Sequence, residues 1–271
     1  MSTTRHLLAL ACVLVTVACS SRTRNSAASH VGGAHAAAAT AAPTTDEAAV
    51  SNGQMVAAHD PSHPPIDCPL RKQGLDSAQL RPFKDTARYI AFLERPDRAA
   101  WQKPDAVVAA LGLTGKEIIV DIGAGSGYFS FRLARAVPQG KVIALDVEPE
   151  MIRHVHHKAM TEGVRNVQVA FAKPDDPGVP LEADLVFMCD VLHHIQDRPA
   201  WLAKLAKEMH TGARLALVEF KEGELPEGPP EAVKLSRAQL VTLVTGAGLA
   251  LDSEKPDLLP YQTFLVFRKA R

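Results

Sequence analysis

Two kinds of hydrophobic pattern alternate along the second half of the chain. Short continuous runs of apolar, largely β-branched residues predict buried strands at 117–122, 141–146, 166–172, 183–189 and 213–220. Stretches in which apolar residues recur every three or four positions predict helices at 127–137, 149–162, 198–210 and 236–246. Strands that alternate with helices are typical of a parallel sheet covered on both faces. The pattern therefore predicts a doubly wound α/β fold.

Both ends of this pattern break the alternation. Before it, residues 84–94 predict an amphipathic helix, and residues 104–112 predict a second one with Pro104 at its start and Gly112 at its end. After it, residues 249–259 and 262–268 predict two strands with no helix between them.

A glycine turn follows the first predicted strand. Gly123, Gly125 and Gly127 occupy alternate positions, which differs from the G-x-G-x-x-G spacing of dinucleotide enzymes. Glycine allows positive φ and leaves no Cβ between the main chain and a ligand. Asp121 ends the strand just before the turn, where an acid disfavours a pyrophosphate. An acid there suits a ligand with a cationic amino group.

A second acid, Asp146, ends the second predicted strand. An acid about 20 residues past such glycines is placed to accept hydrogen bonds from both ribose hydroxyls. Val147 and Met151 follow it and could form an apolar wall for adenine. Either acid alone could be a turn residue that caps the next helix. Both acids together, with the glycines and the strand order, favour S-adenosylmethionine, which carries an amine, a sulfonium and a ribose diol.

Residues 120–127 and 144–151 resemble the corresponding motifs of a class I S-adenosylmethionine-dependent methyltransferase, and residues 183–195 and 210–215 resemble its later elements. The resemblance covers about residues 98 to 269. It implies a Rossmann-like, seven-stranded, mostly parallel sheet whose antiparallel last strand inserts between strands five and six. The cofactor contacts that it implies are Asp121, Gly123, Ala124, Gly125, Gly127, Asp146, Val147, Met151 and Asp190, with Trp101 and Gln102 as weaker candidates from one subgroup.

One position departs from the family pattern. Members often carry Gly-Asp after the third strand, where the acid meets the adenine amino group. This chain has Lys173 and Pro174 there, and lysine cannot accept a hydrogen bond. Either Asp175 or Asp176 substitutes for the acid, or adenine is held by backbone and packing alone.

The acceptor side offers few candidates for catalysis. Methyl transfer is an in-line displacement at a carbon bound to a sulfonium, so the protein mainly aligns the partners. A base is needed only where the acceptor must lose a proton. His193 and His194 are the candidate bases, although one of the pair could instead pack or cap the loop.

The second predicted helix carries three histidines, His154, His156 and His157. Only His154 and His157 share a helix face, and no acid or cysteine completes a ligand set. The sequence therefore predicts no metal site.

The N-terminus has the composition of an export signal. Arg5 precedes an apolar run at 7–18 that is shorter than the about 20 residues needed to span a bilayer. Residues 15–19 resemble the cleavage box of bacterial lipoproteins, which implies a lipid on Cys19. We therefore expect a signal peptide at 1–19, a disordered linker at 20–80 that is poor in large apolar residues, and the methyltransferase domain at 81–271. The expected location is the cell envelope, at the periplasm or outer membrane.

This location conflicts with the supply of S-adenosylmethionine, which is made in the cytosol and does not cross membranes freely. Three alternatives follow: the exported domain works with an unusual supply, the start site is wrong and the protein is cytoplasmic, or the domain no longer transfers methyl groups.

Charge and cysteines narrow the function classes. Lys+Arg and Asp+Glu are equal at 30 each, and no basic block stands out, so we expect no nucleic-acid partner. The four cysteines, Cys12, Cys19, Cys68 and Cys189, form no C-x-x-C pair. Cys189 is predicted to be a small core residue, with a disulfide to Cys68 as the alternative.

The sequence thus favours a methyltransferase that modifies a small-molecule acceptor. The alternative is an exported, non-catalytic module that binds S-adenosylmethionine or a related nucleoside. An NAD-dependent oxidoreductase is disfavoured by the glycine spacing and by Asp121. Nothing in the sequence indicates the oligomeric state.

Overall fold

The computed structural model describes residues 83–270 of the chain. The predicted signal peptide at 1–19, all of the predicted linker at 20–80, and Cys12, Cys19 and Cys68 lie outside the described residues. Among the helices of the described part, none has both the length and the apolar character needed to cross a membrane.

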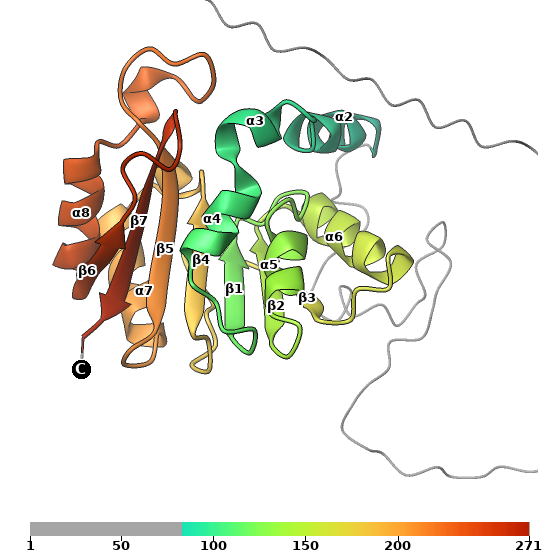
Figure 1. Ribbon diagram of the computed structural model, residues 1–271, viewed down its shortest axis with the longest axis horizontal. Helices are drawn as coiled ribbons and strands as arrows, with labels where there is room; N and C mark the ends of the chain where they lie inside the picture. The colour runs from blue at the N-terminus through green and yellow to red at the C-terminus, as the bar shows by residue number, and fades with distance from the viewer. Residues whose placement is uncertain (1–82, 271) are drawn as a thin grey trace, which may run out of the picture. The chain divides into compact units, whose positions relative to one another are not determined.

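Within residues 83–270, seven strands form one sheet in the order β3-β2-β1-β4-β5-β7-β6 (Figure 1). The strands are β1 (Ile118–Ile122), β2 (Lys141–Asp146), β3 (Val167–Phe171), β4 (Leu185–Cys189), β5 (Arg214–Phe220), β6 (Leu249–Glu254) and β7 (Gln262–Lys269). All pairs from β3 to β5 are parallel, whereas β7 runs antiparallel to both β5 and β6. The expected insertion of the last strand is therefore confirmed.

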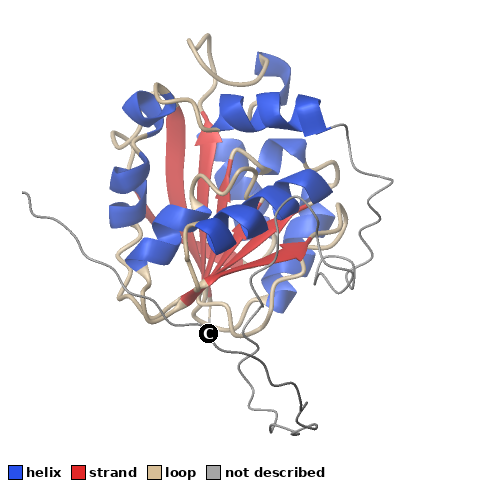
Figure 2. Cartoon of the chain, turned by 90° about the vertical axis from the view of Figure 1, so that its right-hand side faces the viewer, coloured by secondary structure: helices blue, strands red, loops and turns tan. Residues whose placement is uncertain are grey.

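Helices cover both faces of the sheet (Figure 2). Because strand side chains alternate between faces, Ile119 packs with α4 (Pro104–Ala110) and α5 (Ser130–Ala136), while its neighbour Val120 packs with α7 (Arg198–Glu208) and α8 (Arg237–Gly246). The helix α6 (Pro149–Thr161) packs beside α5 on β2 and β3.

Two further helices, α2 (Phe83–Leu93) and α3 (Arg98–Gln102), lie across the carboxyl ends of the parallel strands (Figure 1). Trp101 of α3 packs against Phe220 at the end of β5, with ring centroids 5.7 Å apart. Lys158 of α6 reaches Glu94 at the end of α2, with 2.5 Å between Nζ and Oε1. These contacts fix both helices above the edge where parallel sheets bind ligands.

The structure corrects several sequence-based boundaries. The helix predicted at 198–210 ends at Glu208, and the strand predicted at 183–189 begins at Leu185. The helix predicted at 127–137 begins only at Ser130, because the glycine turn occupies the residues before it. The helix predicted at 104–112 ends at Ala110. The strand predicted at 249–259 ends at Glu254, and a turn leads from there to β7.

Candidate active site

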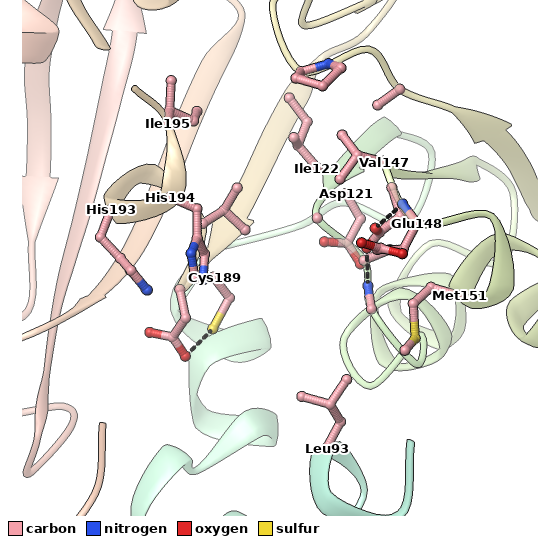
Figure 3. Close-up of a pocket in the computed structure, with 18 of the residues that line it drawn as sticks. Leu93, Asp121, Ile122, Val147, Glu148, Met151, Cys189, His193, His194 and Ile195 are labelled. Carbon is pink, nitrogen blue, oxygen red and sulfur yellow. Dashed lines mark hydrogen bonds between the residues drawn. The ribbon is translucent and has the colours of Figure 1, made fainter. Parts of the chain in front are cut away.

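A cavity of about 1100 Å³ lies beyond the carboxyl ends of β1, β2, β4 and β5 (Figure 3). Pockets for one drug-sized ligand typically measure about 300–1,000 Å³, so this cavity has room for a second molecule. It lies where β1 and β4 are neighbours and the strand order reverses, which is the usual ligand position in such sheets. Of the nine main predicted cofactor contacts, all except Gly127 line it: Asp121, Gly123, Ala124, Gly125, Asp146, Val147, Met151 and Asp190. Of the two weaker candidates, Trp101 lines the cavity and Gln102 does not.

The glycine turn forms one wall of the cavity and packs tightly against the loop after β4. Gly123, Gly125 and Gly127 all have positive φ, from 55 to 79°. A Cβ on Gly123 would lie 2.4 Å from a methyl group of Val191, and one on Gly127 would lie 2.7 Å from the ring of Phe131. Glycine is therefore required here both by the backbone conformation and by the space.

Asp121 is 2% exposed at the start of this turn. The hydroxyl of Ser130 donates a 2.6 Å hydrogen bond to its Oδ2 atom. Burial raises the pKa of Asp121 to about 7, against the opposing effects of the Ser130 hydrogen bond and the charge of Arg98. A ligand ammonium in the cavity would favour the ionised form of this carboxyl group.

Asp146 joins the ends of β2 and the glycine turn. Its Oδ2 atom accepts a 2.8 Å hydrogen bond from the N–H of Gly125, and its Oδ1 atom accepts one of 2.9 Å from the N–H of Glu148. Burial raises the pKa of Asp146. Each carboxylate oxygen can accept two hydrogen bonds, so both retain capacity for ribose hydroxyls. Val147, 43% exposed, and the buried Met151 line the adjoining wall.

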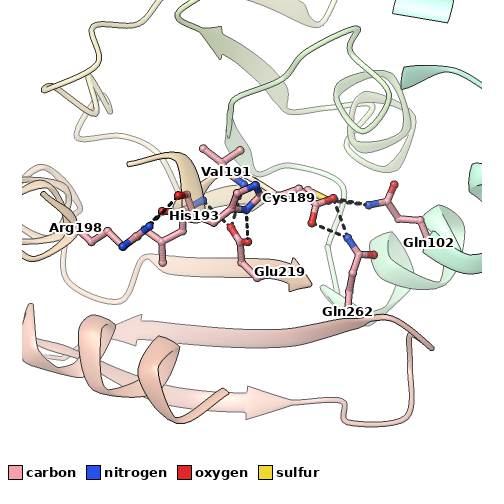
Figure 4. Close-up of polar contacts among 9 residues, drawn as sticks. Gln102, Cys189, Val191, His193, Arg198, Glu219 and Gln262 are labelled. Atoms are coloured by element: carbon pink, nitrogen blue, oxygen red, sulfur yellow. Dashed lines mark hydrogen bonds and ion pairs between the residues drawn. The ribbon is translucent and has the colours of Figure 1, made fainter. Parts of the chain in front are cut away.

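Asp190 has a φ of 59° and a carboxyl group held by two glutamines (Figure 4). The Gln262 side chain donates to both carboxylate oxygens at 2.8 Å, and the Gln102 side chain donates to Oδ2 at 3.1 Å. Burial, followed by the charge of Glu219, raises the pKa of Asp190 to about 7. Gln102 was a weak sequence candidate, whereas Gln262 was missed because nothing in the pattern of β7 marks it.

Cys189 was predicted to be a core residue, but the structure leaves it partly exposed. It lines the cavity and carries a free thiol. Its Sγ atom lies 3.1 Å from Nε2 of Gln102, and burial raises the pKa of the thiol.

The two adjacent histidines, His193 and His194, both line the cavity but have different environments. His193 is buried, and its Nδ1 atom lies 2.8 Å from Oε2 of Glu219. The other oxygen of Glu219 accepts hydrogen bonds from the N–H groups of Val191 and Leu192 at 3.0 and 2.6 Å. His194 is the more exposed of the two, and the desolvation of its covered part, followed by the charge of His193, lowers its pKa. Only His193 is therefore held in a fixed orientation by a carboxylate.

Around the predicted adenine end, Lys173, Asp175 and Asp176 all line the cavity. The N–H of Asp176 donates a 3.2 Å hydrogen bond to the carbonyl of Lys173, which folds this segment into a short turn. Asp175 and Asp176 both stay candidate acceptors for the adenine amino group.

Besides Gln262, two residues of the site, Arg98 and Glu219, were not predicted from the sequence. Arg98 lines the cavity, and its guanidinium lies over the ring of Tyr128 at 4.1 Å from the centroid. Glu219 lies near the end of β5, and its position beside His193 depends on the pairing of β4 with β5. Arg98 lies three residues before Trp101 in the sequence. A positive charge so close to two candidate cofactor contacts was the signal that could have identified it.

The three histidines of α6, His154, His156 and His157, do not line the cavity. His154 has its Nε2 atom 3.8 Å from Oε1 of Glu94. Within the described residues, no three histidine, cysteine, aspartate or glutamate side chains are grouped as a metal site.

Comparisons with known proteins agree with this geometry. Residues 120–215 match the family model described as a methyltransferase domain. Aklanonic acid methyltransferase of Streptomyces sp. (strain C5) is 32% identical over 45% of this chain, which spans 57% of that enzyme's length. Trans-aconitate 2-methyltransferase of Azoarcus sp. (strain BH72) is 26% identical over 65% of this chain and 68% of its own length.

A solved structure is also similar. The crystal structure of a SAM-dependent methyltransferase from Aquifex aeolicus superimposes with a TM-score of 0.63 at 25% identity, covering 68% of this chain and 98% of that protein. The matched segment 120–215 contains the glycine turn, Asp146, Asp190 and His193. The described chain is therefore similar to methyltransferase domains over residues 120–215, and its fold is similar to that of a SAM-dependent methyltransferase.

Proposed function

We propose that this protein transfers a methyl group from S-adenosylmethionine to a small-molecule acceptor. The observation that carries the proposal is the pair of buried carboxyl groups, Asp121 and Asp146, on either side of one glycine turn. Relatives named for aklanonic acid and trans-aconitate support a small acceptor. The chain spans less than two thirds of the Streptomyces enzyme, so this activity rests on the site rather than on that likeness.

The residues of the cavity fit this cofactor. Ser126 Oγ and Tyr128 Oη, from two cavity-lining residues, are buried without a hydrogen-bond partner in the described structure. A buried polar group without a partner costs about 1–3 kcal/mol, which a ligand hydroxyl or amine would offset. S-adenosylmethionine, when bound, supplies a methyl group on a sulfonium, which is a good leaving group.

The residues of the cavity bind the cofactor and exclude water from it. Asp121 binds the ammonium group, Asp146 binds the ribose hydroxyls, and Val147 with Met151 packs on adenine. The roof formed by α2 and α3 excludes water, and Trp101 and Phe220 enclose the acceptor end.

For an acceptor that must lose a proton, His193 is the proposed base. Glu219 accepts a hydrogen bond from Nδ1–H of His193, which leaves Nε2 as the ring atom able to take a proton from the acceptor. Within the described part of the chain, no carboxylate is paired with His194, which is also exposed, so it contributes less.

The experiment is isothermal titration of the protein with S-adenosylmethionine, followed by a radiolabel transfer assay on host extract. Binding together with label in a small-molecule fraction supports the proposal. Binding without transfer favours the alternative of a non-catalytic nucleoside-binding module. Absence of binding contradicts both, and quenching by NADH instead would favour an oxidoreductase.

We also propose that the domain is exported and held at the cell envelope by a lipid on Cys19. The apolar run at 7–18 and the lipoprotein-like box at 15–19 support this location. Fractionation of the host with mass spectrometry of the mature N-terminus tests it. A lipid-modified Cys19 in the membrane fraction is expected, whereas an uncleaved N-terminus in the cytosol would show that the proposal is wrong.

A further inference from the structure

A row of aromatic side chains borders the roof of the cavity. Phe92 of α2, Trp101 of α3 and Phe220 of β5 all line it. The guanidinium of Arg95 lies 4.6 Å from the ring centroid of Phe92 and 5.8 Å from that of Trp101, so it joins the rings of the two roof helices. Phe92 is 56% exposed although it borders the cavity. A ligand with a flat apolar face would cover it.

Trp101 adds one polar atom to this row. Its Nε1 atom is buried and has no hydrogen-bond partner in the described structure. An indole nitrogen only donates hydrogen bonds, so the partner that it lacks is an acceptor such as an oxygen atom. Buried polar groups are nearly always hydrogen-bonded in proteins. We therefore expect the ligand at this end of the cavity to present an oxygen atom to Trp101.

The charge of Arg95 is already balanced by two carboxylates. Its Nε atom lies 3.1 Å from Oδ2 of Asp97, and its Nη2 atom pairs with Oε2 of Glu227. Glu227 itself lines the cavity, on the loop that follows β5. The three side chains together carry a net negative charge. A carboxylate on the ligand would therefore be repelled here rather than bound.

The other lysine and arginine side chains that line the described cavity serve its opposite end. Burial raises the pKa of Asp121, and the charge of Arg98 acts against this, so Arg98 belongs with the glycine turn. Lys204 donates a 2.8 Å hydrogen bond to the carbonyl of Asp175, and Lys173 lies two residues before that acid, on the proposed adenine side. Among the described residues, the aromatic row thus offers no unpaired cation to an anionic ligand.

We propose that the methyl acceptor is an uncharged aromatic molecule with a phenolic hydroxyl group and a second oxygen, and that the Arg95–Glu227 pair selects against carboxylates. This inference rests on the proposed function. Phe220 directly follows Glu219, the residue that orients His193, so the aromatic row and the proposed base meet at the end of β5. A phenol, with a pKa of about 10, is a far stronger acid than an aliphatic alcohol and is within reach of an imidazole base.

The chemical step balances with these groups alone. Nε2 of His193 takes the phenolic proton while the phenolic oxygen forms a bond to the methyl carbon. The bond between that carbon and sulfur breaks, and its electron pair stays on sulfur. The products are an aryl methyl ether and S-adenosylhomocysteine, and the imidazolium then returns its proton to solvent. Trp101 holds the second oxygen of the acceptor through its N–H group.

The test compares two probes that differ in charge, 6-hydroxy-2-naphthamide and 6-hydroxy-2-naphthoate. Each is titrated calorimetrically into protein saturated with S-adenosylhomocysteine, whose own binding is measured first. The wild type should prefer the amide by at least about 10-fold, because like charges repel at the Arg95–Glu227 pair. Glu227→Gln frees part of the charge of Arg95, so it should raise the affinity for the naphthoate by about 3- to 10-fold and leave that for the amide unchanged.

Glu224→Gln is the matched control. Glu224 lies on the same loop and is exposed, and it does not line the cavity. This substitution removes the same charge and should leave both affinities as in the wild type. Trp101→Phe keeps a ring but removes the N–H group, so it should lower the affinity for the amide by about 3- to 10-fold without changing that for S-adenosylhomocysteine. Thermal melting checks the folding of each variant.

A second measurement needs no variant. The radiolabelled product formed in host extract is treated with mild alkali, which hydrolyses methyl esters to volatile methanol and leaves aryl methyl ethers intact. Label that stays with the product is expected for a phenolic acceptor. Label released as methanol would mean that the acceptor is a carboxylate and would overturn the inference.

The outcomes separate this inference from the proposed function. Binding of S-adenosylhomocysteine without a preference for the amide, or equal effects of Glu227→Gln and Glu224→Gln, would overturn the selection by charge and leave methyl transfer standing. A parallel loss of S-adenosylhomocysteine in Trp101→Phe would overturn the assignment of Trp101 to the acceptor. A wild-type protein that binds no S-adenosylhomocysteine would overturn the proposed function itself.

Discussion

The N–H of Gly125 donates a 2.8 Å hydrogen bond to Oδ2 of Asp146, and this bond ties the glycine turn to the end of the second strand. The side chain that is proposed to bind the ribose therefore also holds the main chain that borders the methionine end. The two halves of the proposed cofactor site are one connected unit.

We expect Asp146→Ala to weaken the binding of S-adenosylmethionine by about 1–3 kcal/mol, because it removes charge-assisted hydrogen bonds to the ribose. Isothermal titration measures the change. Asp146→Asn keeps one acceptor oxygen for the turn and should lose less. An unchanged dissociation constant in Asp146→Ala would count against the ribose assignment.

Two glycines with nearly the same backbone conformation separate strain from steric overlap. Gly123 has φ +68° and Gly163 has φ +67°, but only the Cβ of Gly123 would overlap a neighbour, Val191. We expect Gly163→Ala to lower the free energy of unfolding by about 1–2 kcal/mol through the positive φ alone. Gly123→Ala should cost about 1–3 kcal/mol more. Urea denaturation of both variants gives the difference, and equal losses would mean that the loop after β4 yields without cost.

The stability of the ligand-free protein should depend on pH in the direction set by its buried acids. Burial raises the pKa values of Asp121 and Asp190 from 3.8 to about 7. Between these values the folded protein binds more protons than the unfolded chain, so the free energy of unfolding falls as pH rises and levels off above about 7. Asp190→Asn should make the free energy of unfolding fall less steeply with pH. Urea titrations from about pH 4.5 to about 8 measure this, because that range covers most of the interval between the unfolded-state and folded-state pKa values of Asp190. A curve with the wild-type slope would show that Asp190 is ionised throughout.

Binding of S-adenosylmethionine should strengthen as pH rises toward about 7, the raised pKa of buried Asp121, because the ionised carboxyl group attracts the ligand ammonium. Methylthioadenosine, which lacks the amino-acid part, serves as the control and should show little change. Calorimetry in buffers of different ionisation enthalpy would detect the accompanying proton release, and a parallel pH dependence for both ligands would point to a different group.

His193→Ala should reduce methyl transfer by about 10²- to 10⁴-fold for an acceptor that must lose a proton, while the affinity for S-adenosylmethionine stays the same. His194→Ala is the adjacent control and should retain most of the activity. The radiolabel assay on host extract measures both. Equal effects of the two substitutions would contradict the role given to Glu219 in orienting His193.

Much of the sheet was predictable because its parallel strands are largely continuous apolar runs, and the first two carry Asp121 and Asp146 at or next to their last residue. The site was predictable where its chemistry is local in sequence, as in the glycine turn. Helix α3 was missed because five residues are too few to show helical periodicity. The choice between His193 and His194 was equally inaccessible, since it depends on Glu219, which lies 26 positions away and is brought near by strand pairing.

Gln262 shows what the inserted position of β7 entails. This residue lies 72 positions after Asp190, yet its side chain contacts both oxygens of that carboxyl group. A nascent polypeptide that has emerged only as far as β6 must keep the place beside β5 vacant, and Asp190 lacks one of its two amide partners until residues 262–269 enter. The cavity wall at Asp190 is therefore complete only once residues 262–269 have joined the sheet, and a ribosome-stalled fragment that ends at β6 would lack the Gln262 contact.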